Sequence, residues 1–561
     1  MSPLTKLGAL ERAVRSRLSR LQYDRFLERI WKKDSTLWKS DPAHAAVIRN
    51  RLGWLPVVEA MGGEIPRAQR LGETLRGEGV RDVVVLGMGG SSLCPEVLSR
   101  VFPPPPGAAR LRVLDSTDPA SILDLERDLD PGKSFFVVSS KSGTTIETEC
   151  FQRRFDAYLR SAGIDGAGRH FAAITDPGTP LEKLGRSAGY REVFLNPADI
   201  GGRYSALSLF GLAPAALAGL DAEGILDRAR EMLKLSAADS PPERCPGMIL
   251  GAILGEAALA GRDKLTILGP PPLDSFAIWA EQLVAESTGK EGKGLIPVAG
   301  EPPGDPESYG EDRLFVVLEP ERVAEDWGRR IRALEEAGHP VVRIPVAAPC
   351  DLGAEFLRWE LATAVAGSIL GVDPFDEPNV QESKDNTRAL LEEFVKTGSF
   401  QEEEPLGGDE VATFYGEKGG GSPRAILRSF LEALRPGDYF ALQAYLPTRE
   451  ALERPLGRLR DAVRQTRKTA TTLGYGPRYL HSTGQLHKGG PPRGVFLQIV
   501  AEGGEEAAIP GKPFGFSILE QAQALGDFRA LRRHGRPALR VRLREVEAGL
   551  ASLAEQVEKA L

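Results

Sequence analysis

The stretch KSFFVVSSKSGTTIETECFQRRFDAYL, from Lys133 to Leu159, decides the fold. It opens with a short aromatic and β-branched run, Phe135 to Val138, which breaks into a hydroxyl-rich loop, so a buried strand is predicted to end there. Apolar residues then recur at helical spacing, with Thr144 or Thr145 placed to cap the helix. The stretch therefore predicts a strand, a loop and a helix in series.

The loop between this strand and this helix has the properties of an anion-binding site. The first backbone N–H groups of a helix lack intrahelical partners and lie at the positive end of its dipole. The spacing lacks the Gly-x-x-x-x-Gly-Lys-Ser/Thr order of a nucleotide-hydrolysing loop. A phosphate is the ligand that the pattern favours, and an ordinary capped helix is the alternative. The hydroxyls that add further donors belong to Ser140, Ser142, Thr144 and Thr145.

A second loop of this kind follows another predicted strand, Val83 to Leu86, and reads GMGGSS from Gly87. Further strands alternate with helical stretches, which indicates a parallel sheet covered on both faces. Ligands of such sheets bind beyond the carboxyl ends of the strands, so both loops are expected in one crevice. The further strands are predicted at 112–114, 171–175, 193–195, 265–268, 314–318 and 341–346.

Length and composition limit the class of protein. The 561 residues suffice for about three domains of ~100–200 residues, and 42% hydrophobic with 27% charged residues is typical of globular chains. The net charge is −7, from 78 acidic and 71 basic residues mixed along the chain, which disfavours a nucleic-acid or membrane partner. No apolar run has the length of a signal peptide or a membrane span, and the cysteines lie far apart, so a soluble, reduced, cytoplasmic chain is expected.

The order of the predicted elements divides the chain. Residues 1–45 are expected to form a helical lead-in, because Leu, Arg and Lys recur there at helical spacing. Residues 46–225 and 226–397 are each expected to form an α/β domain. Residues 398–424, rich in Gly, Glu and Ser, are predicted to be a flexible linker. Residues 425–561, with strands predicted at 439–445, 494–500 and 538–541, are expected to form a smaller C-terminal α/β module.

Two segments place polar side chains where chemistry could use them. Arg203 follows two glycines in GGRYS, on a loop where the backbone can bend to aim it. Gln282 and Glu286 are four residues apart on a helix predicted over 274–287, and they face the same way beside an apolar stripe. Glu286 lies near the end of that helix, where the dipole disfavours a carboxylate and can raise its pKa, as a base near neutrality needs.

Two further candidates lie later in the chain. Lys384 is predicted in the first turns of a helix, where the dipole is unfavourable for a cation unless its charge is used. His481 and His487 are six residues apart in a crossover of the C-terminal module. Since no cysteine or third histidine lies near them, a metal site is not predicted.

Taken together, these motifs resemble the phosphoglucose isomerase family, in which two sugar-isomerase (SIS) domains carry doubly wound parallel sheets. The resemblance covers residues 45–390 or so, and the continuation HSTGQLHKGG is most similar to the isomerase half of bifunctional transaldolase/phosphoglucose isomerases. The implied fold is α/β, with two SIS domains and a smaller C-terminal α/β module. The matching segments are GMGGSSL at 87–93, SSKSGTT at 139–145, GGRYS at 201–205, EQLVAESTGKEGKG at 281–294 and PFDEPNVQESK at 374–384.

The resemblance also implies roles for single residues. Glu286 is implied to be the base with Gln282 beside it, Arg203 to stabilise an enediolate, and Lys384 and His481 to assist opening of the sugar ring. The residues implied to bind substrate through the phosphate or the sugar are Gly90, Ser91, Ser140, Lys141, Ser142, Thr144 and Thr145.

Two departures from the family pattern bear on these roles. The Leu-His-Ser-x-Gly-Gln string occurs only at 480–485, after Lys384, so His481 can act only if the C-terminal module folds back over the site. Glu377 stands where many relatives have a glutamine.

The activity implied is interconversion of glucose 6-phosphate and fructose 6-phosphate by proton transfer through a cis-enediol(ate), a step of glycolysis and gluconeogenesis. It requires no metal, nicotinamide or flavin. The expected partners are a sugar phosphate and a second copy of the chain, with no nucleic acid and no membrane. The alternatives are a sugar-phosphate-binding regulatory protein without catalysis, an amidotransferase-type sugar isomerase, and an isomerase that also accepts mannose 6-phosphate.

Overall fold

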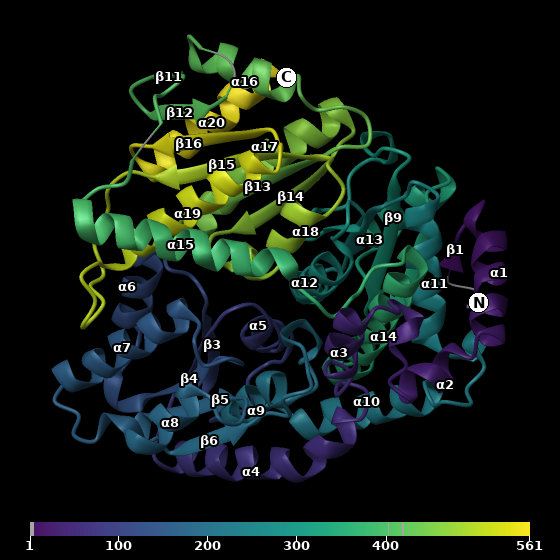
Figure 1. Ribbon diagram of the computed structural model, residues 1–561, viewed down its shortest axis with the longest axis horizontal. Coiled ribbons are helices and arrows are strands. Elements are labelled where there is room, and N and C mark those ends of the chain that lie inside the picture. Colours follow the sequence, from purple (N-terminus) through teal and green to yellow (C-terminus); the bar gives the residue numbers. More distant parts are fainter. Residues whose placement is uncertain (1–4, 402, 418–419) are drawn as a thin grey trace.

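The described residues, which are 5–401, 403–417 and 420–561, form three β-sheets flanked by helices in a computed structural model (Figure 1). Two of these sheets have five strands and the third has six. Neighbouring strands of the first two sheets are parallel, apart from one short edge strand. The α/β class predicted from the sequence is confirmed.

The first sheet carries both loops that were predicted to bind a ligand. Its strand order is β3-β2-β4-β5-β6, so the strands before the two loops are neighbours. The strands are β2 (Asp82–Gly87), β3 (Arg110–Leu114), β4 (Ser134–Ser139), β5 (Phe171–Thr175) and β6 (Glu192–Leu195). The helices of this unit are α4 (Val57–Gly77), α5 (Leu93–Val101), α6 (Pro119–Asp128), α7 (Ile146–Ser161), α8 (Pro180–Ser187) and α9 (Leu209–Ala218).

Both faces of this sheet are buried, which explains the continuous apolar runs of its central strands. Val83 and Val85 of β2 belong to one hydrophobic core, and Val84 and Leu86 belong to another on the opposite face. Helix α7 adds aromatic side chains to the second core. Because central strands held on both faces cannot shift, the loops at their carboxyl ends have fixed starting points.

The second sheet has the order β1-β10-β9-β7-β8. Leu314 and Val316 face the core shared with the first unit, whereas Phe315 and Val317 face a smaller core on the other side. The strands are β1 (Thr5–Lys6), β7 (Lys264–Leu268), β8 (Ile296–Val298), β9 (Arg313–Glu319) and β10 (Val341–Pro345). The helices are α10 (Ala222–Leu235), α11 (Pro246–Leu259), α12 (Phe276–Thr288), α13 (Glu325–Glu336) and α14 (Leu352–Leu370).

The third sheet is formed by the C-terminal part of the chain, drawn in green to yellow in Figure 1. Its order is β11-β12-β16-β15-β13-β14. The strands are β11 (Gly407–Gly408), β12 (Ala412–Gly416), β13 (Tyr439–Tyr445), β14 (Ala470–Tyr475), β15 (Gly494–Ala501) and β16 (Ala538–Leu543). The helices are α15 (Pro378–Thr397), α16 (Pro423–Leu431), α17 (Glu450–Arg467), α18 (Gly484–Gly489), α19 (Phe516–Arg533) and α20 (Val546–Ala560).

The prediction of a flexible linker over 398–424 is wrong for part of that stretch. Strand β12 lies within it and pairs antiparallel with β16. Phe414 is fully buried, because it packs in the core of the third sheet. The strand was not predicted because glycine and glutamate are frequent in this stretch, and because the partner of the five-residue strand β12, strand β16, lies far away in the sequence. Residues 402, 418 and 419 of the predicted linker lie outside the described residues.

The predicted helical lead-in also needs a correction. Helices α1 (Leu10–Tyr23), α2 (Phe26–Trp31) and α3 (Pro42–Arg49) are present, but β1 precedes them and pairs antiparallel with β10. The segment thus adds an edge strand to the second sheet. Residues 1–4 of the predicted lead-in lie outside the described residues.

The three units meet around α12, which lies near the centre of the molecule (Figure 1). This helix contacts α5 of the first unit and α18 of the third. The third unit also packs on the first, where the rings of Phe151 and Phe516 stack at a centroid distance of 5.8 Å. No helix of the described residues combines the length and the apolar character needed to cross a membrane.

A buried cluster of charges joins the second unit to the third. The carboxylate of Glu301 accepts hydrogen bonds from Arg313 of β9 at 3.1 and 3.3 Å and from the hydroxyl of Thr471 in β14 at 3.2 Å. Arg464 of α17 lies 3.7 Å from the same carboxylate. A buried charge is stable only when it is paired, and Glu301 is the carboxylate that pairs with the buried Arg313, whereas Arg464 also pairs with Asp461.

We therefore expect Glu301→Ala to lower the free energy of unfolding by about 3–5 kcal/mol, because it leaves the buried Arg313 without its carboxylate partner. Chemical or thermal unfolding measures this change. The control is Asp326→Ala, which removes an exposed partner of Arg329 and Arg330 and should have little effect. Equal losses for the two variants would contradict the role of Glu301.

Candidate active site

The loop after β4 is built from hydroxyls that bind one another. Ser140 Oγ and Thr145 Oγ1 lie 3.0 Å apart, and Ser142 Oγ and Thr144 Oγ1 lie 2.9 Å apart. The N–H of Gly143 donates to Ser140 Oγ at 3.1 Å, and Gly143 has a positive φ of 65° that favours glycine. Thr145 is the residue before α7, but its side chain does not cap the helix. The hydroxyls thus gather at the start of α7, and a helix N-terminus is a position that favours anions. Phosphate binding there stays a prediction.

Lys141, which was predicted to bind substrate, is engaged within the protein. Its ammonium lies 2.5 Å from a carboxylate oxygen of Asp176 and donates to the carbonyl of Ala198 at 2.9 Å. The side chain therefore ties the loop to the segment after β6, and its charge is already paired.

The turn after β2, η2 (Gly89–Ser91), brings other segments into contact with the first sheet. A Cβ atom on Gly89 would lie 2.6 Å from the carbonyl of His481, and one on Gly90 would lie 2.0 Å from the carbonyl of Gly202. Only glycine permits these approaches. Gly89 and Gly90 thus lie where the loop of Arg203 and the crossover of His481 meet, and Ser91 is the next residue of the same turn.

Arg203, in the turn η5 (Gly202–Tyr204) after β6, is the central cation of the site. Its guanidinium is buried and uses each of its nitrogens. Nε donates to Ser287 Oγ at 2.8 Å, and Nη2 donates to the carbonyls of Pro374 and Asp376 at 2.7 and 2.8 Å. Nη1 lies 3.2 Å from Glu286 Oε1 and donates to Glu377 Oε2 at 3.1 Å.

Glu286 and Gln282 lie together on α12, as their spacing predicted. Gln282 Nε2 donates to Glu286 Oε2 at 3.0 Å and to the carbonyl of His481 at 2.8 Å. Burial raises the pKa of the Glu286 carboxyl, and the charge of Glu377 raises it further, while Arg203 acts in the opposite direction. The shift has the predicted direction, and burial is its largest cause.

His481 reaches the site because the C-terminal module does fold back over the first sheet. It ends the turn η10 (Arg478–His481) after β14, and its Nε2 lies 2.9 Å from Glu147 Oε1. Glu147, in the first turn of α7, also accepts from Gln523 Nε2 at 2.6 Å. The nearby charge of His481 helps to lower the pKa of Glu147, although burial opposes this. The partnership of Glu147 was missed, because nothing local in the sequence indicates it.

Lys384 lies on α15 and faces the same cavity as the hydroxyl loop. This cavity has a volume of about 560 Å³ and is lined by Thr144, Thr145, Glu147, Lys384 and His481 among others. The described residues that line it do not include Arg203, Gln282 or Glu286. Gln282 donates to the backbone carbonyl of the cavity residue His481 and to Glu286, which in turn lies 3.2 Å from Arg203. A series of contacts therefore connects Glu286 to the cavity at the start of α7.

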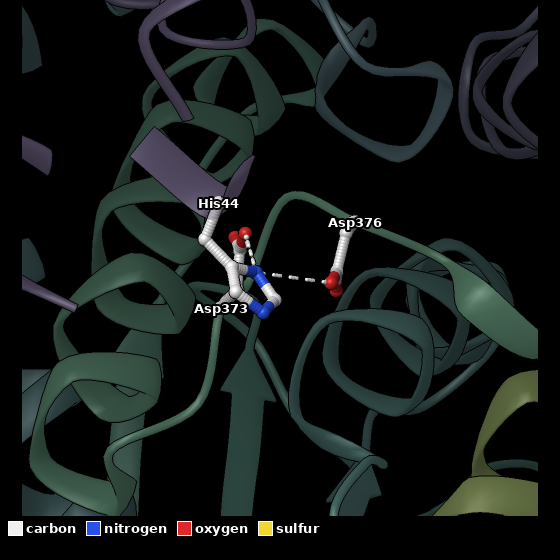
Figure 2. Close-up of side chains that lie close together, drawn as sticks. All are labelled: His44, Asp373 and Asp376. Atoms are coloured by element: carbon white, nitrogen blue, oxygen red, sulfur yellow. Dashed lines mark hydrogen bonds and ion pairs between the residues drawn. The ribbon is translucent and has the colours of Figure 1, made fainter. Parts of the chain in front are cut away.

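The turn that leads into α15, residues 373–377, is held by charges that the sequence did not reveal. His44 Nδ1 lies 3.0 Å from Asp373 and 3.4 Å from Asp376, as Figure 2 shows. On the inner side, the ammonium of Lys290 donates to the carbonyls of Asp373 and Asp376 and lies 2.6 Å from the Asp376 carboxylate. Burial lowers the pKa of Lys290.

These pairs bear on whether the site could hold a metal. His44, Asp373 and Asp376 offer three ligand atoms within 4.8 Å of one another. Since Lys290 already pairs with Asp376 and His44 with Asp373, the contacts account for the cluster, and we assign no metal ligand here. His487 donates or accepts at Nδ1 with the hydroxyl of Tyr439 at 3.0 Å, so its partner is a tyrosine and not His481.

Gln485 fixes the His481 segment to the other elements of the site. Its amide binds both the N–H and the side chain of Asn379, at 2.8 and 2.9 Å, and the carbonyl of Gly289 at 3.1 Å. Gly289 ends α12 and Asn379 starts α15. One buried amide therefore joins α12, α15 and α18.

The chain is similar to proteins of one known family. The family model of phosphoglucose isomerase matches residues 64–294. The chain is 32% identical over 392 residues to the glucose-6-phosphate isomerase of Symbiobacterium thermophilum, an alignment that covers 60% of this chain and 86% of that protein. The chain belongs to the phosphoglucose isomerase family. The family model includes Arg203, Gln282 and Glu286 but ends before Lys384 and His481.

A further relative agrees with this assignment, and two solved structures have a similar fold. A glucose-6-phosphate isomerase of Thermus thermophilus is 30% identical over 358 residues, which cover 56% of this chain and 84% of that protein. A hypothetical protein from the same species has a TM-score of 0.59 at 26% identity, over 69% of this chain and 99% of that one. A glucose-6-phosphate isomerase from Chlamydia trachomatis has a TM-score of 0.51 at 20% identity, over 66% and 78%, and shares the fold.

The raised pKa of Glu286 predicts how stability depends on pH. Between the ordinary value of a glutamate, about 4.3, and the raised folded value, the wild-type protein loses stability as pH rises. Glu286→Gln removes this loss. We expect the melting temperature of the variant minus that of the wild type to increase between about pH 4.5 and pH 8, by about 1–2 °C for each unit of the shift.

Calorimetry over this pH range tests the expectation. Glu382→Gln is the control, because the pKa of Glu382 is lowered next to His534 and Arg533 and should give no such increase. A constant difference between Glu286→Gln and the wild type would show that the pKa of Glu286 is not raised.

Proposed function

We propose that this protein interconverts glucose 6-phosphate and fructose 6-phosphate, with Glu286 as the base. The observation that carries the proposal is the buried carboxylate of Glu286, whose Oε1 lies 3.2 Å from Nη1 of Arg203. Gln282 links this carboxylate to His481, which lines the cavity at the start of α7. The membership in the phosphoglucose isomerase family supports the substrate pair. We also propose that the three sheets mark the two SIS domains and the C-terminal module.

The proton transfer needs a base and a cation close together. Glu286 would remove the proton beside the carbonyl and return it to the neighbouring carbon, and its raised pKa brings its basicity nearer to neutral pH. The negative charge that develops on the cis-enediol(ate) would be stabilised by Arg203, whose position is fixed by Ser287 and the turn before α15. Gln282 would hold the carboxylate by its amide.

The phosphate would bind at the start of α7. The hydroxyls of Ser140, Ser142, Thr144 and Thr145 are donors that can turn from one another to a phosphate oxygen. Gly90 and Ser91 would line the sugar, and the bound phosphate would orient the reacting carbons. Lys141 would act by fixing the loop through Asp176.

Opening of the sugar ring would fall to His481 and Lys384, both of which line the cavity. Glu147 would fix the orientation of the imidazole of His481. This chemistry uses side chains alone and asks for no nicotinamide, flavin or metal. We propose a cytoplasmic homodimer as the working form.

A coupled assay that follows glucose 6-phosphate formed from fructose 6-phosphate tests the activity. We expect Glu286→Gln to lower kcat by ~10²-fold or more with little change in KM, on the scale of acid–base contributions. Glu281→Gln, a buried carboxyl on the same helix, is the matched control and should retain turnover. If Glu286→Gln has wild-type kcat, Glu286 is not the base.

The same assay separates the proposed enzyme from a regulatory protein. Wild-type protein that binds fructose 6-phosphate in calorimetry but forms no product would support the regulatory alternative. Mannose 6-phosphate as the substrate tests for dual specificity.

Removal of a loop hydroxyl tests the phosphate site. We expect Thr145→Val to lower kcat/KM by ~10–100-fold, mainly through KM, because a hydrogen bond to a charged group contributes about 1.5–3 kcal/mol. The control is Thr148→Val on the same helix, since its buried hydroxyl has no partner among the described residues. Equal kinetics for the two variants would place the phosphate elsewhere.

A further inference from the structure

Arg203 contacts a second carboxylate, that of Glu377, and the reaction proposed above gives Glu377 no role. Glu377 Oε2 accepts from Nη1 of Arg203 at 3.1 Å, and the same nitrogen lies 3.2 Å from Glu286 Oε1. The two carboxylates come from different elements, since Glu286 ends α12 and Glu377 precedes α15. One guanidinium nitrogen therefore serves both.

We propose that Glu377 is a positioning residue of the isomerase site: it fixes the guanidinium of Arg203 and shares its charge with Glu286, so that Arg203 does not neutralise the base. This inference rests on the function proposed above. It adds a residue whose effect on the reacting carbons passes through Arg203.

The geometry of the turn carries the first half of the proposal. Arg203 Nη2 donates to the carbonyls of Pro374 and Asp376, and Nη1 donates to the side chain of Glu377. Three acceptors from one short turn thus hold one planar group, a match to the fixed fork of guanidinium donors. His44 pairs with Asp373 of the same turn (Figure 2), and Lys290 pairs with Asp376.

The charges that face Glu286 carry the second half. They come from three elements: Arg203 in η5, Glu377 before α15, and Lys290 after α12. The two cations lower the pKa of Glu286, whereas Glu377 raises it together with burial. Lys290 is already paired with Asp376. Without Glu377, Arg203 is therefore the cation that would pair with Glu286. A strong ion pair with Arg203 would make Glu286 a weaker base.

The test uses variants that separate charge from geometry. Glu377→Gln keeps an oxygen that can accept from Arg203 but removes the charge. We expect the acidic limb of the pH profile of kcat to move to lower pH by about 0.5–1 unit, because Glu286 becomes more acidic. Glu377→Asp retains the charge and should restore part of the limb. Glu377→Ala removes both features, and we expect kcat to fall ~10-fold as Arg203 loses its position.

Glu382→Gln is the matched control, because Glu382 lies on α15 and pairs with His534 and Arg533 outside the site. It should leave the pH profile unchanged. An unchanged acidic limb in Glu377→Gln would overturn the proposal, since a purely structural role would change stability without moving that limb.

A second readout does not depend on turnover. Melting temperatures of the wild type, Glu286→Gln, Glu377→Gln and the double variant form a cycle. If the two carboxylates repel each other, the sum of the single changes exceeds the change in the double variant at about pH 8, and the excess disappears near about pH 4.5, where Glu286 is protonated. Additive changes at both pH values would overturn the proposal. Coupling in a protein without isomerase activity would refute the proposed function, but it would still support the inference that Glu286 and Glu377 share Arg203.

Discussion

The burial of the guanidinium of Arg203 is the constraint on which the arrangement of the site depends. Arg203 has no water to solvate its charge, and an uncompensated buried ion would cost several kcal/mol. Its partners therefore have to come from the elements around it, and they do: Ser287 and Glu286 from α12, and the turn 373–377 before α15. A lysine has a single ammonium with three donors and could not bind all of these groups in one plane. The side chain of Arg203 thus fixes α12 and the turn 373–377 to the loop after β6 of the first sheet.

The same reasoning explains why a carboxylate with a raised pKa can exist in this place. Glu286 is buried, which favours its neutral form, but it stands next to Arg203, which favours the charged form. The balance depends on how much of the arginine is committed elsewhere. Because Glu377 and two backbone carbonyls share that arginine, the carboxylate stays close to its partner without being held as a tight ion pair.

The sequence predicted the parts of the fold that have a strong local signal. Val83 to Leu86 and Phe135 to Val138 could be recognised as strands, because each is a continuous apolar run, as expected of a strand that is buried on both faces. The three-residue strand β8 and strand β12 were missed, since one is too short and the other lies in a glycine-rich stretch. The pairing of Gln282 with Glu286 was predictable because it follows helical spacing.

Contacts between distant parts of the chain could not be predicted in this way. The partnership of Glu147 with His481 spans two units and depends on how the C-terminal module docks. Lys290 was visible only as one charge in a polar loop, although it holds the turn before α15. Local periodicity contains no information on such pairs, because it describes which face of an element is apolar and not what packs against it.

The position of His481 late in the chain becomes understandable once the strands are considered. Five parts of the site follow the carboxyl end of a parallel strand: Gly90 after β2, the hydroxyl loop after β4, Arg203 after β6, α12 after β7, and His481 after β14. Glu377 and Lys384 instead follow helix α14. Parallel sheets present their ligand-binding loops at that edge. The third sheet can therefore bring His481 close to residues of the first two units, and Gln485 fixes the segment after His481 to Gly289 and Asn379.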